Sequence, residues 1–128
     1  MKQWIVLTGC LAVVGACGGS SSSAPTAPSA PAAVSGATIV INSAGAVTPN
    51  RVQIAVGQAV TFANQDTRPH EPSSDPHPAH TDCPPMAQVG QLQPGQQRAT
   101  GAFTTARTCT FHDHLSSADS LRGTIVIQ

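Results

Sequence analysis

The chain has 128 residues, a formal net charge of zero, and charged side chains at only 9% of positions. This balance argues against a basic nucleic-acid-binding protein and against electrostatic docking on anionic lipid. The length allows one domain at most. All six acidic residues and all five histidines lie between positions 66 and 119, so the titratable chemistry is concentrated in one stretch of the chain.

The first 17 residues predict an export signal. A short positive start is followed by an apolar run, residues 4–14, that is too short to span a bilayer. The run ends in Val14-Gly15-Ala16-Cys17, which resembles the bacterial lipobox, in which the cysteine becomes the lipidated first residue. An earlier lipobox ending at Cys10 would leave too short an apolar core, and an ordinary signal peptide is the other alternative. We therefore expect a lipid-anchored protein of the bacterial cell envelope that faces the periplasm or the exterior.

Residues 18–36 predict a tether between the anchor and a folded domain. They are Gly, Ser, Ala, Pro and Thr, with Val34 as the only larger apolar residue. Such a composition cannot bury enough surface to offset its ordering entropy. The remaining residues, 37–128, form the predicted domain, which we expect to be a monomer.

The domain shows short apolar segments of period two, which are typical of strands. The loop-like segments are residues 67–88, with six prolines, and residues 112–122; nothing supports a long helix. About seven short strands in so small a domain predict an all-β fold, a Greek-key β-sandwich. The clearest strands are expected at residues 38–41, 51–56, 59–63, 98–103, 107–111 and 123–127.

The two loops hold every histidine, and the strand that enters the second loop carries Cys109. Loops that leave strands at the same end of a sandwich converge. Imidazole and thiolate donors suit copper and zinc, and two histidines with one cysteine form the ligand set of a blue-copper site. The candidate metal ligands are therefore His70, Cys109, His112 and His114.

In their order and spacing these residues resemble the cupredoxins, the family of plastocyanin and azurin. Residues 56–66 look like the strand–turn–strand that leads to the first copper ligand, which would be His70. Cys109 falls at the thiolate position, and residues 121–127 look like the closing strand of the family. The resemblance implies a copper cofactor and single-electron transfer to a redox partner protein.

The resemblance leaves the second histidine and the axial ligand open. Plastocyanin-like spacing selects His112, whereas azurin-like spacing, with Thr110 and Phe111 shared, selects His114 and is slightly favoured. Leu121 stands where the family has its axial methionine, so the axial position would carry no donor. In cupredoxins this position tunes the redox potential.

Cys83 adds a second alternative. Two cysteines in an exported domain form a disulfide by default, and a Cys83–Cys109 bond would remove the thiolate ligand. Copper would then bind through imidazoles alone. The family position of Cys109 favours it as a ligand, and Cys83 would then be a second thiolate ligand or a free thiol. His77 and His80, close to Cys83, either form a secondary metal site or are solvated loop residues.

Three functions follow from these alternatives. The first is an electron-transfer protein, the second a copper-holding or copper-delivery protein with a Cys83–Cys109 disulfide, and the third a purely structural domain. The sequence lacks G-x-S-x-G and H-E-x-x-H motifs, so we expect no enzymatic activity and assign no catalytic residues. Near the histidines, Asp66, Glu71 and Asp113 either orient imidazoles or are solvated.

Overall fold

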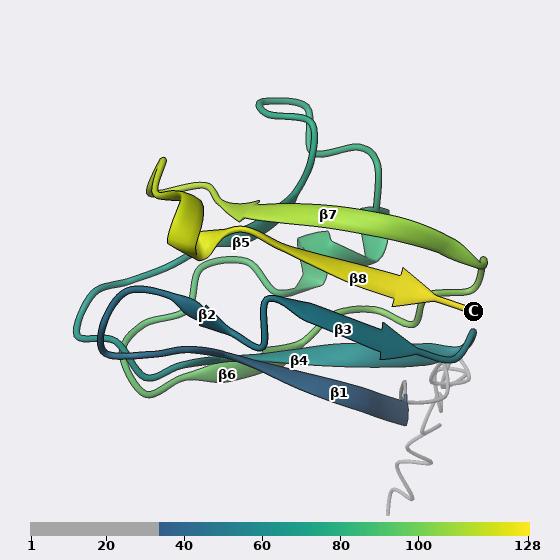
Figure 1. Cartoon of the computed structure of the whole chain (residues 1–128), viewed down its shortest axis with the longest axis horizontal. Coiled ribbons are helices and arrows are strands. Elements are labelled where there is room, and N and C mark those ends of the chain that lie inside the picture. The colour runs from purple at the N-terminus through teal and green to yellow at the C-terminus, as the bar shows by residue number, and fades with distance from the viewer. Residues whose placement is uncertain (1–33) are drawn as a thin grey trace, which may run out of the picture. The chain divides into compact units, whose positions relative to one another are not determined.

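A computed structural model describes residues 34–128, which form two facing four-stranded sheets (Figure 1). This part of the chain contains two short 3-10 helices and no α-helix. The predicted all-β sandwich is therefore confirmed, with eight strands in place of about seven. The elements are β1 (Val34–Ile41), β2 (Val47–Thr48), β3 (Arg51–Ile54), β4 (Gln58–Asn64), β5 (Pro72–Ser74), η1 (Pro84–Gln88), β6 (Gln97–Ala99), β7 (Arg107–Asp113), η2 (Asp119–Leu121) and β8 (Gly123–Ile127).

The first sheet has the order β2-β1-β4-β6, with β1 and β4 parallel. Val60 and Phe62 of β4 face the core, as the period-two pattern predicts. The pairing of β1 with β4 starts at Val34, opposite Gln58. The first strand thus begins inside the range predicted as tether, because pairing with β4 gives its backbone hydrogen-bond partners.

The second sheet has the order β3-β8-β7-β5. Its edge strand β5 lies inside the segment predicted as a loop, and it pairs antiparallel with β7 from Pro72 opposite Asp113 to Ser74 opposite Phe111. This pairing keeps β7 extended to Asp113, beyond the predicted end at residue 111. Since successive side chains of a strand point to opposite faces, Cys109, Phe111 and Asp113 share the inner face and His112 lies on the outer one.

The core between the sheets is small and closely packed. Phe62 and Phe111 meet edge to face, with ring centroids 5.2 Å apart. Gly123 lies against the ring of Phe111, and a Cβ at this position would be 2.6 Å from the carbonyl oxygen of Asn50. A side chain larger than hydrogen therefore does not fit at the start of β8.

Residues 34–128 include no helix that is both long enough and apolar enough to cross a membrane. The predicted export signal, Cys17 and most of the predicted tether lie outside the described residues.

Candidate metal site

Four histidines gather where the loop after β5 lies against the end of β7. One nitrogen of each imidazole can be chosen so that all four atoms lie within 4.8 Å of one another. The loop after β5 extends from the edge of the second sheet, away from the first sheet (Figure 1). We call this group the His cluster; its members are His77, His80, His112 and His114.

His112 presents a free nitrogen to the cluster. Its Nδ1 donates a hydrogen bond to Oδ1 of Asp75, 2.7 Å away, which leaves the lone pair of a neutral ring on Nε2. Among the described residues this Nε2 is the only buried side-chain nitrogen or oxygen without a hydrogen-bond partner. A buried unpaired acceptor is costly, so the geometry suits a metal ion that would take this lone pair.

Asp75 is held as an anion beside His112. Burial would raise the pKa of Asp75, but hydrogen bonds from Thr110 and His112, with the positive charges of His112 and Arg122, lower this pKa below its ordinary value. The carboxylate therefore stays ionised and fixes the orientation of the imidazole.

His80 is held in a similar way by the backbone. Its Nδ1 is 2.7 Å from the carbonyl oxygen of Ser74, which can only accept, so Nδ1 carries a proton and, in the neutral ring, Nε2 carries the lone pair. Nε2 accepts from Nδ1 of His114 at 2.9 Å. The backbone of His80 has a φ of 51°, a left-handed conformation that non-glycine residues adopt at a cost.

His77 completes the cluster from the exposed side. Its ring centroid lies 5.2 Å from that of His114, 5.4 Å from that of His80 and 5.6 Å from that of His112. Desolvation, and then the positive charges that His114, His80 and His112 would carry, lower the pKa of His77 below its ordinary value. A lowered pKa favours the neutral imidazole, which is the form that binds metal.

Cys109 is not part of this cluster. It forms a disulfide with Cys83, and both cysteines are buried. The preferred sequence expectation, Cys109 as a thiolate ligand, is therefore corrected in favour of the disulfide alternative. The reason is the extended β7, which points Cys109 into the core and His112 to the opposite face.

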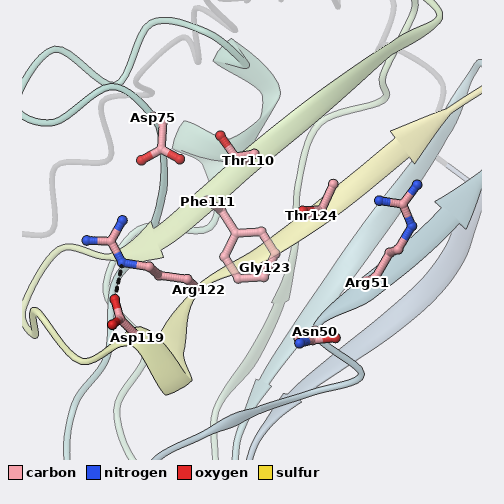
Figure 2. A pocket seen from close by; sticks show the side chains of 9 residues that line it. All are labelled: Asn50, Arg51, Asp75, Thr110, Phe111, Asp119, Arg122, Gly123 and Thr124. Atoms are coloured by element: carbon pink, nitrogen blue, oxygen red, sulfur yellow. Dashed lines mark ion pairs between the residues drawn. The ribbon is translucent and has the colours of Figure 1, made fainter.

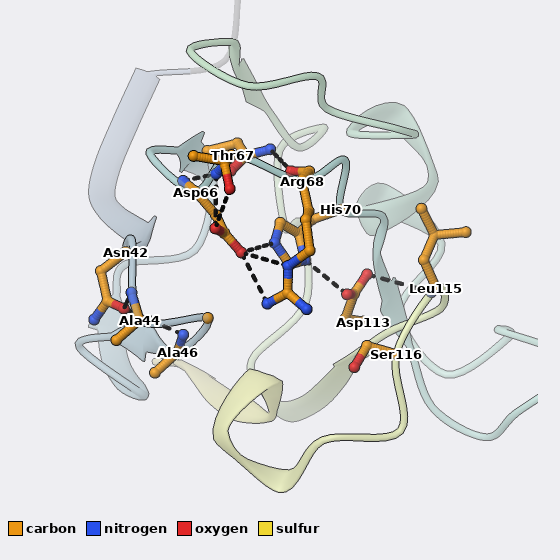
Figure 3. Close-up of polar contacts among 12 residues, drawn as sticks. Asn42, Ala44, Ala46, Asp66, Thr67, Arg68, His70, Asp113, Leu115 and Ser116 are labelled. Atoms are coloured by element: carbon orange, nitrogen blue, oxygen red, sulfur yellow. Dashed lines mark hydrogen bonds and ion pairs between the residues drawn. The ribbon is translucent and has the colours of Figure 1, made fainter.

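His70 also lies outside the cluster, in a buried polar network (Figure 3). Its Nδ1 is 2.8 Å from Oδ2 of Asp113, and its Nε2 is 2.9 Å from Oδ2 of Asp66. Both ring nitrogens thus face carboxylates, and the hydrogen bond from His70, followed by that from the Thr67 backbone, lowers the pKa of Asp66 from 3.8 to about 2. This arrangement differs from the ligand role predicted for His70, because both ring nitrogens are already in contact with carboxylate oxygens.

Asp113 links this network to the His cluster. Its Oδ1 accepts hydrogen bonds from the backbone nitrogens of Glu71, at 2.7 Å, and Leu115, at 3.3 Å. These bonds fix the turn on which His112 and His114 flank Asp113. Asp66 and Asp113 therefore have the orienting role that the sequence left open, although they orient His70 and the turn rather than a ligand.

Leu121, the predicted axial residue, is buried in η2 as part of the core and carries no donor atom. The metal-ligand role of His112 and His114 remains a prediction, and the structure brings them together with His77 and His80 instead of His70 and Cys109.

Sequence reasoning missed Ser74 and Asp75 as partners of His80 and His112. The signal was their position just before Pro76 and the H-x-x-H segment of residues 77–80.

Two cavities are lined in part by Asp75, the carboxylate that holds His112. One, of about 550 Å³, contains Asp75, Arg51 and Arg122, and Figure 2 shows the ion pair of Arg122 with Asp119 at its rim. The other, of about 310 Å³, is lined by three members of the His cluster, His77, His112 and His114. The cluster is therefore reachable from solvent on one side.

No protein-family model and no curated protein sequence matches this chain. Solved structures do match it. A purple cupredoxin from Nitrosopumilus maritimus superposes with a TM-score of 0.55 at 19% identity, over 72% of this chain and 99% of its own length. The oxidised plastocyanin of Dryopteris crassirhizoma gives 0.56 at 17% identity, over 71% and 99%.

A copper(I) form of an amicyanin variant gives a TM-score of 0.56 at 18% identity, over 77% of this chain and 87% of that one. The chain has the cupredoxin fold. On this cupredoxin fold, the potential metal ligands are four imidazoles on the outer face of a sheet, and a disulfide takes up the cysteine of β7.

Proposed function

We propose that this protein holds a copper ion in the His cluster and delivers it to an acceptor. The observation that carries the proposal is the orphaned, buried Nε2 of His112 inside a group of four imidazoles. Imidazole nitrogens suit copper and zinc, and copper(II) is bound most strongly of the divalent first-row metals. The copper in the amicyanin neighbour supports the choice of copper on this fold.

The four histidines supply neutral nitrogen donors without a net negative charge. His112 and His80 offer Nε2 because Asp75 and the Ser74 carbonyl hold their Nδ1 protons. A carboxylate or carbonyl behind a metal-binding imidazole fixes the ring and increases its basicity. The ion is cargo in this role, and the protein binds and releases it without catalysis.

Titration of purified protein with Cu(II), followed by visible absorption, electron paramagnetic resonance and thiol assay, tests this function. We expect one ion per chain, nitrogen hyperfine structure, weak colour and no free thiol. Substitution His112→Ala should abolish stoichiometric binding, whereas Thr108→Ala, on the same face of β7, should leave it unchanged. An intense charge-transfer band that depends on Cys109, or no bound copper, would contradict the proposal.

Single-electron transfer to a redox partner protein is the second candidate, favoured by the likeness to plastocyanin. It requires Cys109 as a free thiolate. Copper added after reduction of the disulfide should then give the intense band, and the reduced protein should exchange electrons. Absence of this band in the reduced, copper-bound protein would exclude a thiolate-ligated site.

We also propose that the protein works as a monomer anchored by a lipid at Cys17, in the bacterial cell envelope, facing the periplasm or the exterior. The apolar run and the lipobox-like residues before Cys17 support this location.

A further inference from the structure

The four histidines of the His cluster are held with unequal firmness. His80 has its Nδ1 bound to the Ser74 carbonyl, and its own carbonyl accepts from the Ser74 hydroxyl at 2.9 Å. His112 is bound to Asp75, and its side chain is only 8% exposed. These two rings are fixed before any ion arrives.

The other two histidines are exposed and loosely held. Within the described residues, the ring of His77 makes no hydrogen bond, and the ring of His114 makes only the bond from its Nδ1 to His80. An ion bound at Nε2 of His80 must displace that bond, so His114 is free to reorient. His77 and His114 are therefore the exchangeable members of the cluster.

A cavity opens on the side of the exchangeable pair. It measures about 310 Å³ and is lined by His77, His114 and His112, while His80 is not among its lining residues. Leu115, Ser116 and Ser117 form the rest of the rim near His114. A molecule in this cavity would reach the ion from the side of the loosely held imidazoles.

We infer that this cavity is an exchange site, where a neutral nitrogen donor of an acceptor molecule takes over the copper ion. The inference rests on the proposed copper-holding function. The bond from copper to His114 or His77 breaks as a bond to the incoming nitrogen forms, while His80 and His112 still hold the ion. The oxidation state does not change, and no electron or proton need be supplied.

The charges around the cavity favour a neutral donor over an anion. The carboxylates of Asp75 and Asp113 line it, and its one lining arginine, Arg122, is already paired with Asp119. The bound copper ion would attract an anion, but these two carboxylates oppose that attraction, whereas a neutral donor meets no such repulsion. The imidazole side chain of an acceptor protein has the required chemistry.

Free imidazole, titrated into copper-loaded protein, is the first probe. We expect a saturable change in the visible and electron paramagnetic resonance spectra, and weaker binding of azide. Substitution Ser117→Trp, which fills the cavity, should weaken imidazole binding by about 10-fold and slow copper transfer to a chelator, with the copper affinity unchanged. The matched control is Thr104→Trp, in a separate cavity that no histidine lines, which should have no effect.

Chemical rescue is the second probe. Free imidazole should restore the wild-type copper spectrum to His114→Ala and His77→Ala, since their missing ligand can enter through the cavity. It should not restore this spectrum to His80→Ala. The same holds for His80→Gln, a variant that keeps more of the side-chain volume. Circular dichroism of each variant verifies the fold.

The outcomes separate this inference from the proposed function. Rescue of all the variants alike, or copper-bound wild-type protein that shows no imidazole adduct, would overturn the exchange site and leave copper holding intact. Wild-type protein that binds no copper would overturn both.

Discussion

At the scale of single residues, the cluster depends on which nitrogen of each ring faces inward. Asp75 settles this for His112 by accepting its Nδ1 proton. Substitution Asp75→Asn keeps the shape but removes the charge, so we expect the copper affinity to fall by about 10- to 100-fold. Competition titration with a chelator of known affinity measures this change.

Asp119→Asn is the matched control for Asp75→Asn. It removes a carboxylate that pairs with Arg122, but its side chain is exposed and contacts no histidine. The copper affinity should remain at the wild-type value. An equal loss in both variants would show that overall charge, rather than the bond to His112, determines affinity.

The Asp66–His70–Asp113 network makes the stability of the metal-free protein depend on acid pH. The pKa of Asp66 is lowered from 3.8 to about 2, so the folded state prefers the ionised carboxylate. Its contribution is complete above the unfolded pKa near 4 and is lost as the pH falls toward 2. Thermal unfolding followed by circular dichroism should show a steeper loss between pH 4 and 2 in wild type than in Asp66→Asn.

Parallel pH curves for the two proteins would mean that Asp66 contributes nothing in this range.

The sequence indicated His70 as functional because it stands where cupredoxins have a ligand. In the structure His70 is instead a polar core residue, because its ring lies between two carboxylates. Asp66 precedes it by four residues, and Asp113 is on β7.

At the scale of elements, the disulfide joins β7 to the residue before η1. It closes a loop between positions 26 apart in the chain. The double variant Cys83→Ala/Cys109→Ala should lose about 3–4 kcal/mol of unfolding free energy, because the unfolded chain is no longer constrained. Urea unfolding followed by circular dichroism measures this loss.

Copper binding should survive in that double variant, since neither sulfur belongs to the His cluster. A folded double variant that binds no copper would show that the disulfide, or a free Cys109, is needed for the site.

The short strand β5 has a comparable importance for the geometry. By pairing with β7 as far as Asp113, it keeps that strand extended where a loop was predicted.

At the scale of the whole molecule, we expect the lipid anchor at Cys17 to keep the protein on the membrane. Substitution Cys17→Ser in the full chain should move it from the membrane fraction to the soluble fraction of a bacterial host and abolish incorporation of labelled fatty acid. Cys10→Ser is the control, because it removes the other lipobox-like cysteine and should leave both readouts unchanged.

The fold class followed from sequence alone, because period-two segments such as residues 59–63 specify which strand face is buried. The chemistry of the site was also predicted in part, because all five histidines fall in two predicted loops. Tertiary structure decided which of them meet. The pairing of β5 with β7 set Cys109 and His112 on opposite faces, and Asp113 of β7 occupies Nδ1 of His70. No local pattern encodes these outcomes, because each depends on a partner residue from 26 to 43 positions away along the chain.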